Sequence, residues 1–171
     1  MRKAEHRRYK LRTFIFFLTG LIIIAADQLT KNWIRVSLAP GQSLFDTGFF
    51  RIVRVHNTGA AFGIFPDQNL ALIIFALVGI AVLFVYIFVV YRNYPSLDSL
   101  LGRIGFGMIL GGTIGNLIDR LYFGYVTDFL DFSYWPAFNV ADPALIIGIL
   151  LFAYSLLGLL QTEKYHDRQG V

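Results

Sequence analysis

The sequence contains no cysteine, only three histidines and few charged residues. The lack of Cys excludes disulfides, thiolate nucleophiles and Cys-ligated metal sites. His6 and His166 lie in the polar chain ends, which leaves His56 alone for a histidine metal site or a Ser–His pair. The serines near the polar segments lack a supporting motif. Carboxylates are therefore the remaining candidates for catalysis.

Charged residues make up 15% of the 171 residues, whereas 56% are hydrophobic. A soluble domain with so much apolar surface would aggregate, so the composition predicts a membrane protein. The length is enough for one domain. The net charge of +4 could indicate a nucleic-acid partner. The basic residues, however, cluster at the chain ends and beside apolar runs, which favours membrane topology and no nucleic acid.

Four apolar runs are long enough to cross a bilayer, which takes roughly 20 helical residues. They cover about residues 13–33, 70–91, 104–121 and 143–160. The basic start and first run could instead form a cleavable signal peptide, but no small-residue cleavage site follows them. In the third run, glycines recur every four residues and predict close helix packing in lipid: Gly107, Gly111 and Gly115. We therefore expect an all-α, four-helix membrane bundle forming a single domain over residues 1–171.

The distribution of basic residues predicts how the bundle is oriented. Four spans place both termini on one side, and ten of the 15 Lys and Arg residues fall on that side. Because cytoplasmic segments carry the excess of positive charge, we expect cytoplasmic termini. Residues 34–69 and 126–142 then face outward together. Within 34–69, the β-rich segments Ser43–Asp46 and Phe49–His56 predict a hairpin.

Polar side chains gather at the outer ends of the predicted spans, where they are costly unless they have a function. Asp27 and Lys31 are four residues apart on one helix face, which predicts either an ion pair or a scaffold for active-site groups. Asn116, Asp119 and Arg120 are expected to share a face at the end of the third span. An Asp–Arg pair there could clamp a peptide carbonyl, orient a carboxylate or simply close the helix.

Two further motifs allow both a structural and a functional interpretation. Asn57-Thr58-Gly59 is typical of a turn, but Gly59 also permits close approach of a substrate and Asn57 can hold an extended peptide. Asp142 precedes Pro143, a pattern that predicts a helix start with Asp142 as the N-cap. An N-cap carboxylate is rigidly positioned, so capping is compatible with catalysis.

Three carboxylates lie in one outer stretch, Asp128, Asp131 and Asp142. Two carboxylates brought close together cannot both ionise easily, so one stays protonated as an acid while the other activates water. The residues alone leave open which two of the three form such a pair. They also leave open a small ion-coupled transporter or a non-catalytic assembly subunit, because intramembrane polar groups serve those functions too.

Five blocks occur together along most of the chain: Asp27-Gln-Leu-Thr-Lys31, Asn57-Thr-Gly-Ala-Ala-Phe62, Gly115-Asn116-Leu-Ile-Asp119-Arg120, Val126-Thr-Asp128-Phe129 and Phe138-Asn-Val-Ala-Asp142. In order and spacing they resemble the lipoprotein signal peptidase (signal peptidase II) family. The likeness runs from Asp27 to about Leu150. One departure is Thr127, where that family is expected to have the isosteric Val.

The resemblance implies a bacterial inner-membrane aspartyl protease with four spans and a small extracytoplasmic β-cradle. Such an enzyme cuts the signal peptide from prolipoproteins just before a Cys that carries diacylglyceryl. We expect a monomer in contact with membrane lipid, needing no metal or cofactor, in which segments 57–65 and Phe132–Phe138 close over the substrate. The resemblance implies Asp128 and Asp142 as the catalytic pair, with supporting residues Asp27, Asn57, Asn116, Arg120 and Asn139.

Overall fold

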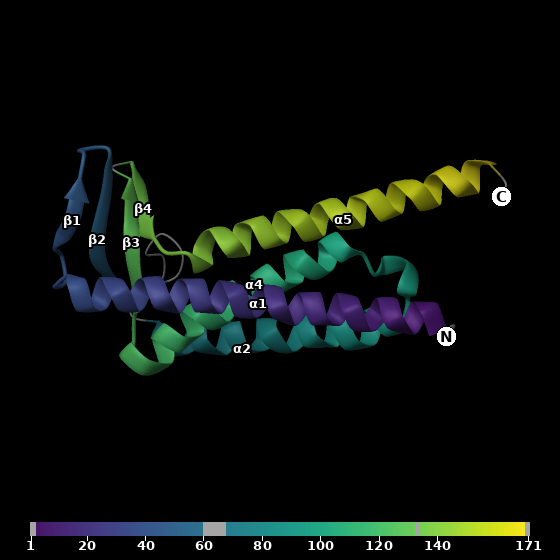
Figure 1. Ribbon diagram of the computed structural model, residues 1–171, viewed down its shortest axis with the longest axis horizontal. Coiled ribbons are helices and arrows are strands. Elements are labelled where there is room, and N and C mark those ends of the chain that lie inside the picture. The colour runs from purple at the N-terminus through teal and green to yellow at the C-terminus, as the bar shows by residue number, and fades with distance from the viewer. Residues whose placement is uncertain (1–2, 60–67, 133, 170–171) are drawn as a thin grey trace.

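Four long helices and a small sheet make up the computed structural model, which describes residues 3–59, 68–132 and 134–169 (Figure 1). The long helices are α1 (Lys3–Ser37), α2 (Asn69–Val85), α4 (Leu100–Phe123) and α5 (Ala141–Gln169). A π-helical turn, η2 (Tyr86–Val90), continues α2 into the short α3 (Tyr91–Asn93). The 3₁₀ turn η3 (Pro95–Leu97) then leads to α4.

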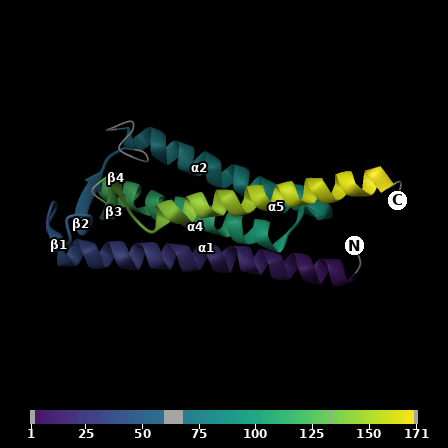
Figure 2. The same cartoon turned by 90° about the horizontal axis from the view of Figure 1, so that it is seen from above.

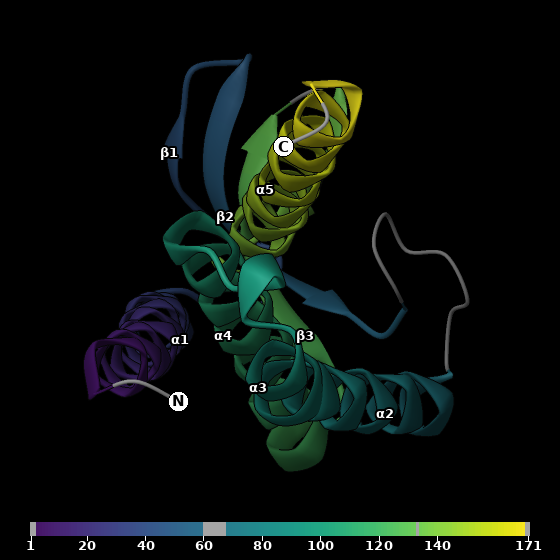
Figure 3. The same ribbon diagram turned by 90° about the vertical axis from the view of Figure 1, so that its right-hand side faces the viewer.

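The four long helical segments are each long and apolar enough to cross a membrane. The first three cover Lys3–Ser37, Asn69–Asn93 and Leu100–Phe123, and the fourth covers Ala141–Gly158. Seen from above and from the end, they run roughly along one axis (Figures 2 and 3). The predicted four-helix membrane bundle is confirmed.

Helix α4 occupies the middle of the bundle because its glycines let two neighbours approach closely. A Cβ atom on Gly111 would lie 2.7 Å from the carbonyl oxygen of Gly20 in α1. A Cβ atom on Gly112 would lie 2.6 Å from the carbonyl oxygen of Ala141 in α5. The predicted glycine packing is therefore confirmed, and successive glycines serve different neighbours.

All four strands form one antiparallel sheet at the end of the bundle opposite the two termini (Figure 1). Its order is β1 (Ser43–Asp46), β2 (Phe50–Asn57), β3 (Val126–Phe132) and β4 (Trp135–Phe138). The predicted hairpin is confirmed as β1 and β2. Pairing of β2 with β3 joins two parts of the chain that lie about 70 residues apart, with Val55 opposite Asp128.

Strands β3 and β4 were not predicted, because the sequence marked residues 126–142 only as a stretch that faces outward. The first four residues of β3 are all buried, from Val126 to Phe129. A strand buried on both faces lacks the alternation of polar and apolar residues that marks a strand in a sequence. Strand β3 contacts both α1 and α4, so its sequence lacks the alternation of polar and apolar residues.

We predict that Gly111→Ala lowers the unfolding free energy by about 1–3 kcal/mol, since the added methyl must push α1 away from α4. Gly79→Ala in α2 is the matched control, because a Cβ atom there meets nothing within 4 Å. Both changes bring the same gain in helix propensity. Thermal unfolding of the detergent-solubilised variants measures the difference. Equal melting temperatures would contradict the close-packing interpretation.

Candidate active site

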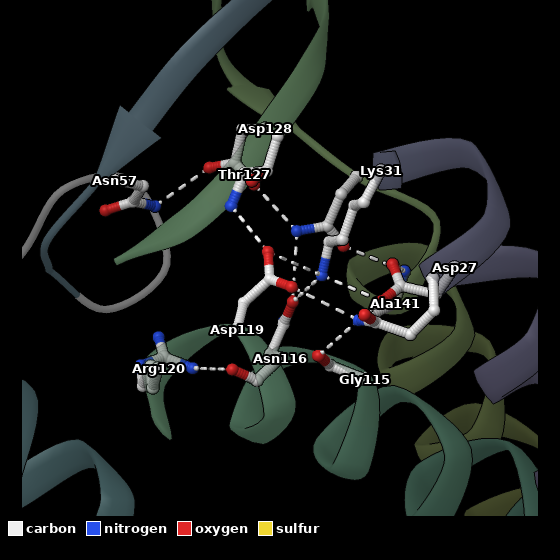
Figure 4. A network of polar contacts seen from close by, with 12 residues as sticks. Asp27, Lys31, Asn57, Gly115, Asn116, Asp119, Arg120, Thr127, Asp128 and Ala141 are labelled. Carbon is white, nitrogen blue, oxygen red and sulfur yellow. Dashed lines mark hydrogen bonds and ion pairs between the residues drawn. The ribbon is translucent and has the colours of Figure 1, made fainter. Parts of the chain in front are cut away.

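Asp128 lies on β3 with only 2% of its surface exposed, and both of its carboxylate oxygens accept hydrogen bonds. Asn57 Nδ2 donates to Oδ2 at 2.9 Å, and Asn139 Nδ2 donates to Oδ1 at 2.7 Å. The Asn57 amide is itself oriented, because its Oδ1 accepts the backbone N–H of Gly59 at 2.9 Å. Figure 4 shows Asn57 approaching this carboxylate from the end of β2.

Asp142 lies in the first turn of α5 and is held by two donors. Asn116 Nδ2 donates to its Oδ1 at 2.9 Å, and the backbone N–H of Asn139 donates to its Oδ2 at 3.0 Å. The side chain of Asn139 in turn accepts from the backbone N–H groups of Ala141 at 2.8 Å and Asp142 at 3.3 Å. This reciprocal pattern is a capping box.

The prediction that Asp142 caps the helix is therefore wrong, because Asn139 takes the capping position. Asp142 lies three residues further on and turns its carboxylate back toward Asn139. The arrangement fixes Asp142 in place while one of its oxygens remains available to Asn116.

A single residue, Asn139, contacts both carboxylates. Its side-chain amide donates to Asp128 and its backbone amide donates to Asp142. The same Nδ2 also donates to Asn116 Oδ1 at 3.0 Å. Asn139 is completely buried, so these contacts are shielded from solvent. Asp128 and Asp142 are thereby fixed on the wall of one groove.

Asp131 occupies a different environment from the other two aspartates. It forms an ion pair with Arg51, which lies directly opposite it on β2. Asp128 and Asp131 are three positions apart in one strand, and such residues point to opposite faces of a sheet. Of the three carboxylates, the structure brings Asp128 and Asp142 together.

Burial raises the pKa of Asp128, and the nearby charge of Asp142 raises it further, to about 7. The hydrogen bonds from Asn57 and Asn139 act in the opposite direction, because they favour the ionised form. Burial is the larger effect. A carboxyl group with this pKa can hold or release a proton near neutral pH.

Lys31 supports the site from inside the bundle. Its ammonium group is completely buried, pairs with Asp27 at 2.8 Å and donates to Asn116 Oδ1 at 2.8 Å. Because Asn116 Oδ1 is occupied in this way, its Nδ2 is turned toward Asp142. The predicted Asp27–Lys31 ion pair is confirmed. Asp27 also accepts the backbone N–H of Ala141 at 3.1 Å, which ties α1 to the start of α5.

The predicted pairing of Asp119 with Arg120 is wrong, because adjacent helical residues point in different directions. Asp119 accepts from Arg35 at 3.1 Å and from the backbone N–H of Thr127 at 2.9 Å. Arg120 instead donates to the carbonyl oxygen of Gly59 at 3.1 Å and lines the groove. Asp119 therefore anchors β3, and Arg120 holds the end of β2.

Sequence reasoning missed Gln28 and Arg35. Gln28 Nε2 donates to the Gly115 carbonyl oxygen at 2.9 Å and reaches both Asp27 and Asp119 at 3.2 Å. Arg35 also donates to the Thr127 hydroxyl at 3.2 Å. Arg35 could have been found, because it continues the four-residue spacing of Asp27 and Lys31.

The two aspartates face a groove of about 520 Å³ between α2, α4, α5 and β4. Apolar side chains from two helices line much of it, including Leu72 and Ala76 of α2 and Leu145 and Ile146 of α5. Trp135 and Phe138, from the predicted lid Phe132–Phe138, line its rim. Most of the second predicted lid, 57–65, lies outside the described residues. The groove can thus receive a largely apolar ligand beside two carboxyl groups.

Within residues 3–59, 68–132 and 134–169, no three His, Asp or Glu side chains form a group that could hold a metal ion. The polar groups that line the groove include the two carboxyl groups and the side-chain amides of Asn57 and Asn116. Two carboxyl groups in a shielded groove are suited to proton transfer with a bound water molecule.

Comparison with known proteins gives one consistent result. The family model described as signal peptidase (SPase) II matches residues 19–158. A lipoprotein signal peptidase of Dehalococcoides mccartyi is 45% identical over 139 residues, which is 81% of this chain and 86% of the relative. That of Moorella thermoacetica is 43% identical over 143 residues, 83% of this chain and 92% of the relative. A solved structure described as a bacterial membrane enzyme is 28% identical, with a TM-score of 0.73 over 84% of this chain and 87% of that one.

The raised pKa of Asp128 predicts a pH-dependent stability difference between the wild type and Asp128→Asn. Between about pH 4 and pH 7 the folded protein binds more protons than the unfolded chain, so stability falls as pH rises. The shift corresponds to at most about 4 kcal/mol, and the Asn variant lacks this loss. The melting temperature of Asp128→Asn relative to wild type should therefore be several degrees higher at pH 8 than at pH 5.

Asp131→Asn provides the matched control, since it removes a carboxylate from the same strand at the sheet surface. Melting curves of the three proteins in one detergent at both pH values give the comparison. For Asp128→Asn, the melting-temperature difference from wild type should change between pH 5 and pH 8, and for Asp131→Asn it should not. If the difference for Asp128→Asn were the same at both pH values, a raised pKa of Asp128 would be contradicted.

Proposed function

This chain belongs to the signal peptidase II family, and on that premise we propose that it is an aspartic endopeptidase with Asp128 and Asp142 as its catalytic pair. It removes signal peptides from prolipoproteins. The observation that supports this pair most directly is the contact of one buried residue, Asn139, with both carboxyl groups. The third candidate, Asp131, is engaged by Arg51 elsewhere on the sheet.

The proposed substrate is a prolipoprotein whose Cys carries diacylglyceryl, and the cut falls just before that Cys. Such a substrate combines an apolar signal helix, two acyl chains and a polar peptide bond. The groove has matching parts, since apolar residues of α2 and α5 and the two aspartates all line it.

In the proposed mechanism Asp128 begins protonated, in keeping with its raised pKa, and Asp142 begins ionised. Asp142 removes a proton from a water molecule, whose oxygen forms a bond to the peptide carbonyl carbon. Asp128 gives its proton to the carbonyl oxygen, which produces a tetrahedral diol.

Collapse of the tetrahedral diol completes the reaction. The C–N bond breaks as Asp142 returns its proton to the leaving amine nitrogen. One diol hydroxyl passes its proton back to Asp128 as the carbonyl re-forms as part of a carboxylic acid. Water has then been added across the peptide bond, and both aspartates have regained their starting protonation states.

The surrounding polar residues act by positioning the pair. Asn57, Asn116 and Asn139 donate to the carboxyl oxygens, and Lys31 fixes the orientation of Asn116. Such preorganised donors avoid reorganisation during the reaction. Arg120 holds the Gly59 carbonyl beside the groove, where the backbone of the substrate would pass.

We further propose a multi-pass protein of the bacterial inner membrane, with cytoplasmic termini, the sheet on the outer face and a monomeric enzyme. The basic N-terminal turns of α1 and the sheet lie at opposite ends of the bundle (Figure 1). This separation supports the orientation because positive charge accumulates on the cytoplasmic side.

Asp128→Asn and Asp142→Asn are each expected to lower the cleavage rate by about 10²–10⁴-fold or more, because each removes one proton-transfer group. The assay combines purified protein in detergent with a diacylglyceryl-modified prolipoprotein peptide and identifies the products by mass spectrometry. Asp131→Asn is the matched control and should retain most activity. Full activity in either of the first two variants, or equal cleavage of the peptide without its lipid, would contradict the proposal.

The rate should also depend on pH in a defined direction. As pH rises through about 7, Asp128 loses its proton and the acid of the pair is lost. We therefore expect kcat/KM to fall on the alkaline side of about pH 7. A profile that keeps rising to pH 9 would show that a protonated Asp128 is not required.

A further inference from the structure

A second pocket lies at the end of the bundle opposite the sheet, where the first turns of α1 meet α3 and η3. It has a volume of about 300 Å³. No part of the proposed peptidase mechanism uses it. It is lined mainly by arginine and tyrosine side chains, among them Arg8, Tyr9, Arg12, Tyr91 and Arg92.

The pocket is built from one face of α1. Glu5, Arg8, Tyr9 and Arg12 follow the spacing i, i+3, i+4 and i+7, which places them on a single helix face. Arg7 and Lys10 belong to the same basic segment but fall outside this face. The arginines of the pocket are therefore separated from the rest of the N-terminal charge by helix geometry.

Positive charge exceeds negative charge at this pocket. Asp98 is shared, because its carboxylate pairs with Arg12 at 3.6 Å and with the buried Arg103 at 2.8 Å. One carboxylate therefore serves two guanidinium groups. Arg8 and Arg92 add two more positive charges from exposed positions on the rim. Glu5 provides the other negative charge of the lining.

Arg103 strengthens the positive potential from behind the pocket wall. It is completely buried, with its guanidinium carbon 4.9 Å from the ring centre of Tyr9 and 4.6 Å from that of Tyr91. Its Nη2 has no hydrogen-bond partner among the described residues. A buried charge that is only partly compensated acts strongly on its surroundings, because the effective dielectric constant there is low.

An exposed apolar seam begins directly beside the pocket. Phe88 lies three residues before Tyr91, a residue of the pocket lining, which is about one helical turn. The ring of Phe88 lies 6.4 Å from that of Phe17 on α1, and both rings are more than 40% exposed. The basic pocket and the seam of Phe17 and Phe88 thus form one surface with a charged end and an apolar end.

We propose that this surface binds an anionic phospholipid. Its phosphate group accepts hydrogen bonds from Arg8, Arg12 and Arg92, and its acyl chains lie along the seam of Phe17 and Phe88. Arginine is suited to this contact, since its planar guanidinium matches the oxygens of a phosphate. A soluble phosphate compound would satisfy the charged end but would leave the apolar end unused.

The test uses the full-length protein with Arg8→Gln and Arg92→Gln combined. Both side chains are exposed, so the fold should be unaffected. Arg7→Gln combined with Lys10→Gln is the control, because it removes the same charge from the same end of the protein outside the pocket lining. Short-chain phosphatidylglycerol is titrated in detergent, and bound lipid is measured by native mass spectrometry and by the melting temperature.

We expect the pocket variant to bind phosphatidylglycerol about tenfold or more weakly than wild type, and the control to remain within about twofold. Phosphatidylcholine and inorganic phosphate are run in parallel, and both should give a smaller melting-temperature shift than phosphatidylglycerol. If both double variants bound phosphatidylglycerol equally weakly, the proposal would be overturned. The binding would then reflect a general attraction between the basic end of the protein and an anionic lipid. If inorganic phosphate raised the melting temperature as much as phosphatidylglycerol, a phospholipid would be contradicted as the ligand.

Discussion

The buried ammonium group of Lys31 determines how the sheet end of the bundle is assembled. A charge without access to water is very unfavourable unless it is paired and hydrogen-bonded. Lys31 meets this requirement by drawing together Asp27 from its own helix and Asn116 from α4. Asp27 can lie this close to α4 because the facing residue is Gly115, where a Cβ atom would lie 2.5 Å from its carboxylate oxygen.

The same constraint extends to the two aspartates of the groove. Asn116 links Lys31 to Asp142, and Asn139 links Asn116 to Asp128. A continuous series of hydrogen bonds therefore connects the interior of the bundle to the sheet. The neighbours of each amide in this series fix which way its oxygen and nitrogen point, so neither Asp128 nor Asp142 can turn its carboxyl group away. The raised pKa of Asp128 follows from the same burial that makes this order possible.

Much of this arrangement could be predicted from the sequence, but not all of it. Local patterns were sufficient for the spans, the glycine contacts of α4 and the first hairpin, because each depends on residues close together in the chain. The proposed catalytic pair could be selected only through the family resemblance, since the sequence pattern alone left Asp131 as a candidate. The structure separates Asp131 by its contact with Arg51. Strand β3 and the partners of Asp119 depend on contacts between distant segments, which no local pattern encodes. The cap at Asn139 is local, and the spacing of Asn139 and Asp142 could have indicated it.

The sheet also has a consequence for the biogenesis of the protein. Asn57 and Asp128 are 71 residues apart, and they meet only when β3 pairs with β2. A two-stranded hairpin alone is marginally stable in water, so β1 and β2 gain a lasting partner only after α4 has been synthesised. The groove is therefore complete only after β3, β4 and the first turns of α5 have been added behind α4. Until those segments exist, the chain has no enclosed site in which the proposed cleavage could take place.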